Sequence, residues 1–315
     1  MSRRSGAEIN MDILCFGEPM LEFNEQSDGR FLAGHGGDTS NCAVAASRSG
    51  ARVGVLTHLG ADAAGDSFMQ LWKNEGIDTE AVARNAHAHT GIYFITHGPD
   101  GHSFSYLRKG SAASLIRPSD IDPEVIGRAG ILHVSGITQA ISDTSCDAAF
   151  AAIDAARSAG VKVSYDTNLR QKLWPLPRAR AVIHAAMEMA DIALPGLEDA
   201  EALTGLSDPD AIADFYLGLG AETVALTLGS DGTLVAAGDR RERVAAFPVE
   251  AVDATAAGDT FDGAFLAELR AGSDPFVAAR YANAAAALST QGYGAVAPMP
   301  TRNAVEAFLR ERGDG

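Results

Sequence analysis

Short apolar runs recur along the chain and alternate with segments that have the periodicity of packed helices. Six runs have the length of buried strands: 11–16, 53–59, 131–134, 161–165, 192–194 and 223–228. Four segments are predicted as helices, each followed by a glycine: 42–49, 65–75, 142–159 and 276–291. This alternation of strands and helices predicts an α/β domain built on a mainly parallel sheet.

Two aromatic-rich runs, 91–97 and 102–108, interrupt the alternation and are joined by a Gly-Pro-Asp-Gly turn sequence. They predict a β-hairpin inserted into the α/β pattern. Side chains alternate faces along a strand, so Phe104, Tyr106 and Arg108 are expected on one face of this hairpin. Because an isolated hairpin is only marginally stable, it must pack on the main domain, on a substrate or on another subunit.

A further stretch combines acidic and small residues at the start of a predicted helix: Asp253-Ala-Thr-Ala-Ala-Gly-Asp-Thr-Phe-Asp-Gly-Ala-Phe265. The backbone N–H groups around Ala256, Ala257 and Gly258 can approach a ligand closely, because these residues carry almost no side chain. A helix start offers unpaired N–H donors and partial positive charge, which suit a phosphate. Asp259 lies beside them as a proton acceptor, so the stretch indicates phosphoryl transfer to a hydroxyl. The alternative is a structural helix that Asp259 caps.

Polar residues also follow two other predicted strands. The glycines at 34, 36 and 37 let a ligand rest against the backbone, and Asp38 or Thr39 would cap the helix that follows. The segment Asp166-Thr-Asn-Leu-Arg170 lies at the edge where open parallel sheets bind ligands. Arg170, together with Arg108 of the hairpin, could supply local positive charge for an anionic substrate. The alternatives are a structural salt bridge for Arg170 and a solvated charge for Arg108.

Composition and charge narrow the choice of partners. The chain has 315 residues with 46% hydrophobic content, which is enough for one large domain. The 25 Lys and Arg residues are outnumbered by 41 Asp and Glu residues, and the net charge of −16 argues against nucleic acid or an anionic membrane as a partner. An anionic substrate would therefore need a local basic pocket.

The cysteines and the first residues indicate the compartment. Cys15, Cys42 and Cys146 lack metal or redox spacing, as expected of buried thiols in a reducing environment. No apolar run is long enough to span a bilayer, and the N-terminus lacks the apolar core of a signal peptide. We therefore expect a cytoplasmic protein whose residues 1–10 form a disordered extension.

The stretch from Asp253 to Phe265 resembles the second signature of the PfkB family of carbohydrate kinases, and Gly36, Gly37 and Asn41 match the first signature. The resemblance spans nearly the whole chain. It implies a ribokinase-like three-layer α/β domain over residues 11–315, with a mainly parallel central sheet and a small β-sheet lid inserted from about 18–34 and 88–112.

The resemblance also assigns roles to individual residues. Catalysis is expected from Asp259 as the base, with the backbone at Ala256, Ala257 and Gly258 around the phosphate. The sugar site is expected to contain Gly36, Gly37, Asp38, Asn41, Tyr93, Tyr106, Arg108, Asp166, Arg170 and Asp259. The nucleotide site is expected to contain Asn168, Thr227, Gly229, Gly232, Gly258 and Asn283. Asp253 would bind a monovalent cation such as K⁺, and Asp199 would act on a metal through water.

Two departures from the family pattern concern this site. Ala256 stands where most members have Gly, and Gly196 and Asp199 stand where members usually have Asn and Glu. The second departure bears on the metal and phosphate contacts of that motif. An acidic cluster at a helix start is the alternative interpretation of Asp199.

Two features resemble the branch of the family that phosphorylates 2-keto-3-deoxygluconate: the Ala-Ala-Gly-Asp order and the Asp38-Thr39 pair. The expected reaction is transfer of the γ-phosphoryl of ATP, with Mg²⁺, to the terminal hydroxyl of that sugar acid, giving the 6-phosphate. A fructokinase or ribokinase acting on a neutral sugar is one alternative, and a non-catalytic regulator that binds sugar or nucleotide is another. The family's β lid often joins two subunits, so a homodimer is expected.

Overall fold

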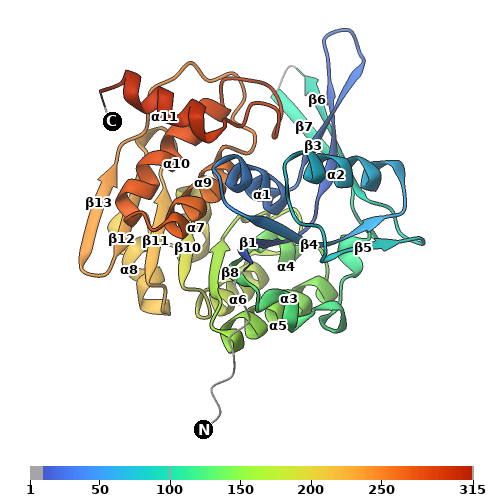
Figure 1. Ribbon diagram of the computed structural model, residues 1–315, viewed down its shortest axis with the longest axis horizontal. Helices are drawn as coiled ribbons and strands as arrows, with labels where there is room; N and C mark the ends of the chain where they lie inside the picture. Colours follow the sequence, from blue (N-terminus) through green and yellow to red (C-terminus); the bar gives the residue numbers. More distant parts are fainter. Residues whose placement is uncertain (1–9, 99–100, 314–315) are drawn as a thin grey trace.

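The computed structural model describes residues 10–98 and 101–313. The predicted N-terminal extension, apart from Asn10, therefore lies outside the described residues, as does the middle of the Gly-Pro-Asp-Gly turn. Two sheets organise the described chain, a large one of nine strands and a small one of four (Figure 1).

The large sheet forms the middle layer. Its strands run in the order β13 (Arg240–Val244), β12 (Thr233–Ala237), β11 (Thr223–Thr227), β10 (Ile192–Leu194), β9 (Lys162–Asp166), β8 (Ala129–Ser135), β1 (Met11–Phe16), β4 (Val53–Gly60) and β5 (Val82–Asn85). The strands from β11 to β5 pair in parallel, whereas β12 and β13 are antiparallel additions at one edge. The mainly parallel sheet expected from the apolar runs is confirmed.

In the middle of the sheet, alternate residues of a strand pack against different helix layers. In β1, Leu14 and Phe16 pack into one core, while Ile13 and Cys15 pack into the other. The first face is covered by α3 (Pro123–Ile126), α4 (Gly136–Ala140), α5 (Asp143–Ala159), α6 (Leu176–Met187), α7 (Leu197–Thr204) and α8 (Pro209–Leu219). The second is covered by α1 (Asp38–Arg48), α2 (Ala63–Asn74), α9 (Ala257–Ala271), α10 (Pro275–Ser289) and α11 (Arg302–Glu311). The result is the three-layer architecture expected.

The small sheet is the lid. Its strands run in the order β3 (Phe31–Gly36), β2 (Met20–Glu25), β6 (Gly91–Gly98) and β7 (Gly101–Leu107), and it projects from one end of the molecule in Figure 1. The predicted hairpin is β6–β7, in which Tyr93 lies opposite Tyr106. The Phe104 and Tyr106 rings lie 6.3 Å apart between centroids and Arg108 Cζ lies 5.5 Å from the Tyr106 ring, so these three share one face as expected, and Tyr93 joins them from the neighbouring strand.

Helix α1 begins earlier than its sequence predicts. It starts at Asp38, and its N-cap is Gly37, whose φ of 97° favours glycine. Asp38 and Thr39 lie inside the first turn, and no side chain caps the helix. The expectation that one of them caps α1 is therefore wrong, and the carboxylate of Asp38 remains available for other contacts.

Candidate active site

The candidate site lies at the carboxyl ends of β9 and β10, next to the N-terminus of α9. A cleft of about 230 Å³ opens here. It is lined by Asp166, Asn168, Arg170, Leu194, Gly196, Asp199, Thr227, Ala254, Ala256, Ala257, Gly258, Asp259 and Asp262. This is the edge at which open parallel sheets bind ligands. The structure thus brings the 166–170 segment and the 253–265 stretch together.

The start of α9 has the form of an anion-binding site. Within the described residues, the N–H groups of Gly258 and Asp259 donate to no protein acceptor. An added Cβ at Gly258 would meet no atom within 4 Å, so the cleft is open in front of it. Two unpaired amides and the positive end of a 15-residue helix therefore face a space that can hold a phosphate group.

Asp259 lies beside these amides as the third residue of α9, so it does not cap the helix. Its Oδ2 accepts a hydrogen bond of 2.8 Å from Asn41 Nδ2. Burial, and then the negative charge of Asp38, raise the pKa of Asp259 to about 7, although the Asn41 hydrogen bond and the charge of Arg170 act in the opposite direction. A carboxylate with a pKa near neutrality is suited to accept a proton from a hydroxyl.

Asp38 is held from two directions. Its Oδ2 accepts a hydrogen bond from Ser135 Oγ, at the end of β8, and another of 3.2 Å from Asn168 Nδ2. Its Oδ1 is buried and has no hydrogen-bond partner among the described residues. A buried oxygen without a donor is the group that a substrate hydroxyl would satisfy.

Asp262 is a site residue that the sequence analysis did not identify. It lies three residues after Asp259, on the same side of α9, and lines the cleft beside Asp166. Burial is the main cause that raises the pKa values of Asp262 and Asp166 well above their ordinary range, and the charges of Asp259 and Asp38 raise both further. A carboxylate within a run of apolar helix positions was the signal in the sequence.

Glu18 was also missed, and it changes the interpretation of Arg108. The Glu18 carboxylate is fully buried and accepts hydrogen bonds from Arg108 Nε and Nη2, at 2.8 and 2.6 Å, and from Ser111 Oγ at 2.5 Å. Arg108 is therefore not a solvated charge. Two of its three guanidinium nitrogens, Nε and Nη2, donate to one oxygen of a buried counter-ion, and its binding to a substrate carboxylate remains a prediction.

Glu22 lies in the same lid, opposite Tyr93. Tyr93 Oη donates to Glu22 Oε2, and a Cβ at Gly36 would lie 2.5 Å from Tyr93 Oη. Only glycine at position 36 therefore leaves room for the Tyr93 hydroxyl beside residues 34–37. Burial raises the pKa of Glu22, and the charge of Asp253 raises it further.

Arg170 lines the cleft with an exposed side chain. Its Nη1 donates to the Leu169 carbonyl at 3.0 Å, and it makes no ion pair with any described residue. The alternative of a structural salt bridge thus finds no partner. Arg170 thus places a positive charge in a cleft whose other charged residues are acids, and this charge lowers the pKa of Asp259.

Of the residues expected at the nucleotide, Thr227 lines the cleft, and Gly229 and Gly232 belong to the turn after β11. Thr227 lines the cleft and forms a parallel bridge with Gly196. Gly232 approaches the backbone closely, because an added Cβ would lie 2.1 Å from the Val244 carbonyl oxygen. Gly229, with a φ of 60°, begins the turn between β11 and β12. These glycines support a tight loop at the end of the sheet.

Asn283 is buried, and its polar atoms are used within the protein. Its Oδ1 accepts from Thr233 Oγ1 at 2.8 Å, and its Nδ2 donates to the carbonyls of Val244 and Ala245. Asn283 therefore fixes α10 to the edge of the sheet. Its direct contact with a nucleotide remains a prediction.

Two carboxylates expected near metal ions make backbone contacts. Asp199 Oδ2 accepts from the Leu169 N–H at 2.8 Å, and Asp253 accepts from the N–H groups of Thr255 and Gly294. Within residues 10–98 and 101–313, no group of three or more His, Cys, Asp or Glu side chains is arranged to hold a metal ion. Asp199 and Asp166 nevertheless line the cleft and offer oxygen ligands of the kind that Mg²⁺ prefers.

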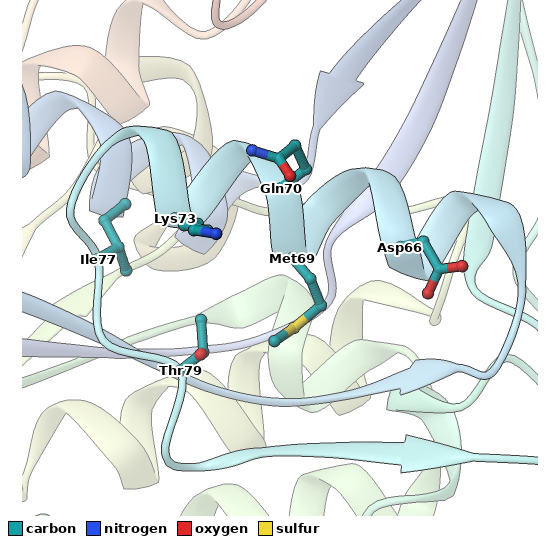
Figure 2. A pocket seen from close by; sticks show the side chains of 6 residues that line it. All are labelled: Asp66, Met69, Gln70, Lys73, Ile77 and Thr79. Carbon is teal, nitrogen blue, oxygen red and sulfur yellow. The ribbon is translucent and has the colours of Figure 1, made fainter.

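A second hollow, of about 450 Å³, lies away from these acids, along α2 and the segment that leads to β5. Figure 2 shows its lining side chains, among them Met69, Lys73 and Thr79. It contains neither a nucleophile with a base nor an unpaired helix start. The cleft at α9 is therefore the candidate active site. In the described part of the chain, no helix has the length and apolar character needed to cross a bilayer.

Comparison with known proteins finds relatives over nearly the whole chain. The model of the family described as "pfkB family carbohydrate kinase" matches residues 10–302. A 2-dehydro-3-deoxygluconokinase of Bacillus subtilis (strain 168) is 32% identical over 313 residues, covering 96% of each chain. A probable fructokinase-2 of Arabidopsis thaliana is also 32% identical, over 319 residues and 95% of each chain.

Two solved structures have the same fold. The PfkB protein of Polaromonas sp. JS666 is 33% identical, with a TM-score of 0.86 over 94% of this chain and 99% of that one. A fructokinase of Xylella fastidiosa, solved with bound ATP, is 26% identical, with a TM-score of 0.88 over 96% of this chain and 99% of that one. The matches cover 94% and 96% of this chain, so the likeness is one of the overall fold.

Proposed function

Since the chain belongs to the pfkB family of carbohydrate kinases, we propose that it transfers the γ-phosphoryl group of ATP to the terminal hydroxyl of 2-keto-3-deoxygluconate. The observation that carries the proposal is Asp259, a carboxylate with a pKa of about 7 beside two unpaired amides at a helix start. This arrangement supplies a base for the hydroxyl and donors for phosphate charge at one place.

The reaction follows from these positions. The sugar hydroxyl loses its proton to Asp259 as its oxygen bonds to the γ-phosphorus, and the bond to the bridging oxygen of ADP breaks. The amides of Gly258 and Asp259 bind the phosphate oxygens, and the Asp38 Oδ1 accepts a hydrogen bond from another sugar hydroxyl. Mg²⁺, held with the nucleotide near Asp199 and Asp166, would neutralise phosphate charge. A monovalent cation near Asp253 belongs to the same proposal.

The acidic substrate is supported by Arg170 and by the relative from Bacillus subtilis. Arg170 is an exposed cation in the cleft that pairs with no described carboxylate. A substrate carboxylate would supply the partner that it lacks. Arg108 would add a second contact from the lid, through the nitrogen that does not bind Glu18.

A neutral sugar is the second candidate, and Glu18 favours it. The buried Glu18 carboxylate compensates the charge of Arg108, which leaves Arg170 as the unneutralised cation beside the cleft. A fructokinase or ribokinase would need no cation in the cleft, because its sugar substrate is neutral. A regulator without turnover is less well supported, because binding alone requires no base at the phosphate site.

The substrate class is tested by measuring ADP formation with 2-keto-3-deoxygluconate, fructose and ribose at equal concentrations. We expect kcat/KM to be highest for the sugar acid. Arg170→Ala should raise the KM for the acid about 10-fold, as expected for loss of a charge-assisted hydrogen bond, and should leave the KM for fructose within about twofold. Turnover of fructose or ribose alone would refute the acidic substrate.

The role of Asp259 is tested by Asp259→Asn and by a pH profile. The variant should lose about 10²- to 10⁴-fold in kcat while it still binds ATP. In the wild-type protein, Asp259 is protonated below a pKa of about 7, so kcat/KM should fall as pH decreases below that value. A rate that is unchanged between pH 8 and pH 5.5 would exclude Asp259 as the base.

We also infer a homodimer formed through the lid. Four large apolar side chains of the lid are among the more exposed in the described chain: Phe31, Leu32, Tyr106 and Leu107. Apolar side chains concentrated on one projecting sheet are typical of an interface. Sedimentation velocity should show a dimer for the wild type and a larger monomer fraction for Leu107→Glu; a wild-type monomer at micromolar concentration would contradict the inference.

A further inference from the structure

Asn168 combines an unusual backbone with a buried side chain. It follows β9, and its φ is 26°, so that only it and Ala256 have positive φ among the non-glycine residues described. Left-handed backbone is unfavourable for side chains other than glycine, although Asn tolerates it best. Such a conformation persists only where the surroundings hold it, and it often occurs at functional sites.

The contacts of the 166–170 segment show what holds it. The N–H of Asn168 donates to Asp166 Oδ1 at 3.0 Å, and the N–H of Leu169 donates to Asp199 Oδ2 at 2.8 Å. The Asn168 side chain then points toward α1, where its Nδ2 donates to Asp38 Oδ2 at 3.2 Å. Asn168 is thus fixed at its backbone, and its side-chain amide is directed to Asp38, one of the residues expected at the sugar.

Ser135 completes the arrangement from the next strand. Its side chain is fully buried, and its Oγ donates to the same Asp38 oxygen that accepts from Asn168. Two donors on one carboxylate oxygen fix the rotation of the carboxylate about its Cβ–Cγ bond. The other oxygen, Oδ1, is then kept without a protein partner, in a residue that is only 8% exposed.

We propose that Asn168 is a positioning residue for the sugar, which acts through Asp38 together with Ser135, and that its main role is not contact with the nucleotide. The inference rests on the proposed function, in which Asp38 Oδ1 accepts a hydrogen bond from a sugar hydroxyl. Without the amide of Asn168, the Asp38 carboxylate can rotate, and the acceptor no longer lies where the hydroxyl arrives.

Asn168 also lines the cleft beside Thr227 and Gly196. A direct contact with the nucleotide is therefore the competing account, and the two accounts predict different kinetic changes. A positioning residue for Asp38 affects the KM for the sugar. A nucleotide ligand affects the KM for ATP.

The first experiment compares Asn168→Gly, Ser135→Ala and the wild type. Asn168→Gly removes the amide but accommodates the positive φ, so its backbone is not strained. We expect the KM for the preferred sugar to rise about 5- to 10-fold in both variants, as for loss of one hydrogen bond, with the KM for ATP within about twofold of the wild type. A rise in the KM for ATP that equals or exceeds the rise for the sugar in Asn168→Gly would overturn the proposal.

A double-mutant cycle with Asp38→Asn tests whether the effect passes through Asp38. If it does, Asn168→Gly should change the sugar KM by less than about twofold in the Asp38→Asn background, because contacting residues are not additive. Full multiplication of the two effects would contradict the proposal. Ser135→Ala should show the same non-additivity.

Failure of the proposed function would be recognised separately. If the wild type turns over none of the sugars, the proposed function is wrong, and a crystal structure of Asn168→Gly then decides the inference without substrate. A rotated Asp38 carboxylate would support the positioning role of Asn168. A carboxylate that keeps its orientation would overturn it.

Discussion

At the scale of single residues, Ala256 combines a Cβ with a backbone conformation that favours glycine. It is the N-cap of α9 and has a φ of 60° and a ψ of 17°, which is left-handed. This conformation costs about 1–2 kcal/mol for a residue with a Cβ. The left-handed turn is therefore a physical reason for the Gly that the family pattern has at this position.

Ala256→Gly should consequently stabilise the protein by about 0.5–1 kcal/mol, since relief of the left-handed strain exceeds the entropy that glycine adds to the unfolded chain. Urea unfolding measures this change. Ala257→Gly is the control at the next residue, because Ala257 is the first residue of α9 and has no positive φ, so its substitution should leave stability unchanged or lower it by up to about 1 kcal/mol. Equal destabilisation by both substitutions would show that Ala256 is not strained.

The site residues that could be predicted differ from the others in where their partners lie. Asp38 and Asp259 belong to motifs with neighbouring glycines, so their own segments indicate a role. Glu18 follows β1, Glu22 lies within β2 and Ser135 ends β8, and their partners are 90, 71 and 97 positions away, respectively. Such pairings depend on how the sheets assemble, and local sequence does not contain them.

At the scale of elements, the lid depends on the pair formed by Glu18 and Arg108. Glu18 follows β1, whereas Arg108 follows β7, the edge strand of the lid, so the pair ties the end of this edge strand to the central sheet. Arg108 Cζ also lies 5.5 Å from the centroid of Tyr106. Removal of one partner of a buried ion pair leaves a charge without compensation.

Glu18→Ala should therefore lower the free energy of lid opening by about 3 kcal/mol. Hydrogen exchange of the β6 and β7 amides measures this local opening. Arg30→Ala is the matched control in the same sheet, because the Arg30 and Asp28 side chains are 84% and 48% exposed and such pairs contribute less than about 1 kcal/mol. If both variants exchange like the wild type, the pair does not hold the lid.

The elements themselves were predictable where an apolar pattern was strong. The central strands and the hairpin β6–β7 were identified because their apolar or aromatic residues are continuous. Strand β13 was not, because its sequence Arg-Arg-Glu-Arg-Val has the composition of a solvated segment. It pairs through its backbone, while Arg241 forms ion pairs with Asp210 and Asp214 of α8. Helix α8 itself was missed, although Asp208-Pro209 is a helix-start signal.

At the scale of the whole molecule, the acids of the cleft make stability depend on pH. The folded-state pKa values of Asp259, Asp166 and Asp262 are raised above the ordinary value of 3.8. Such groups contribute stability that is fully present below their unfolded pKa and is lost as pH rises through the folded pKa. His133 acts in the opposite direction, because burial lowers its pKa to about 4 and stability is lost as pH falls from 6.5.

Asp262→Asn isolates one of these acids. The variant should be more stable than the wild type, and its advantage should grow between pH 5 and pH 8, by at most about 1.4 kcal/mol per pH unit. Urea unfolding at several pH values measures the difference. Asp28→Asn, on the exposed lid turn, should show no such growth. An advantage that is constant with pH would mean that Asp262 is charged in the folded protein throughout this range.

The hydrogen bond from Asn41 to Asp259 joins residues that are 218 positions apart. A ribosome that adds about 5–20 residues per second needs about 10–40 s to synthesise that interval. Throughout this time α1 lacks α9, the helix against which its small residues pack. The nascent chain must therefore keep its first helix in a partly folded state, and no fragment that ends before α9 can assemble the base with its partner.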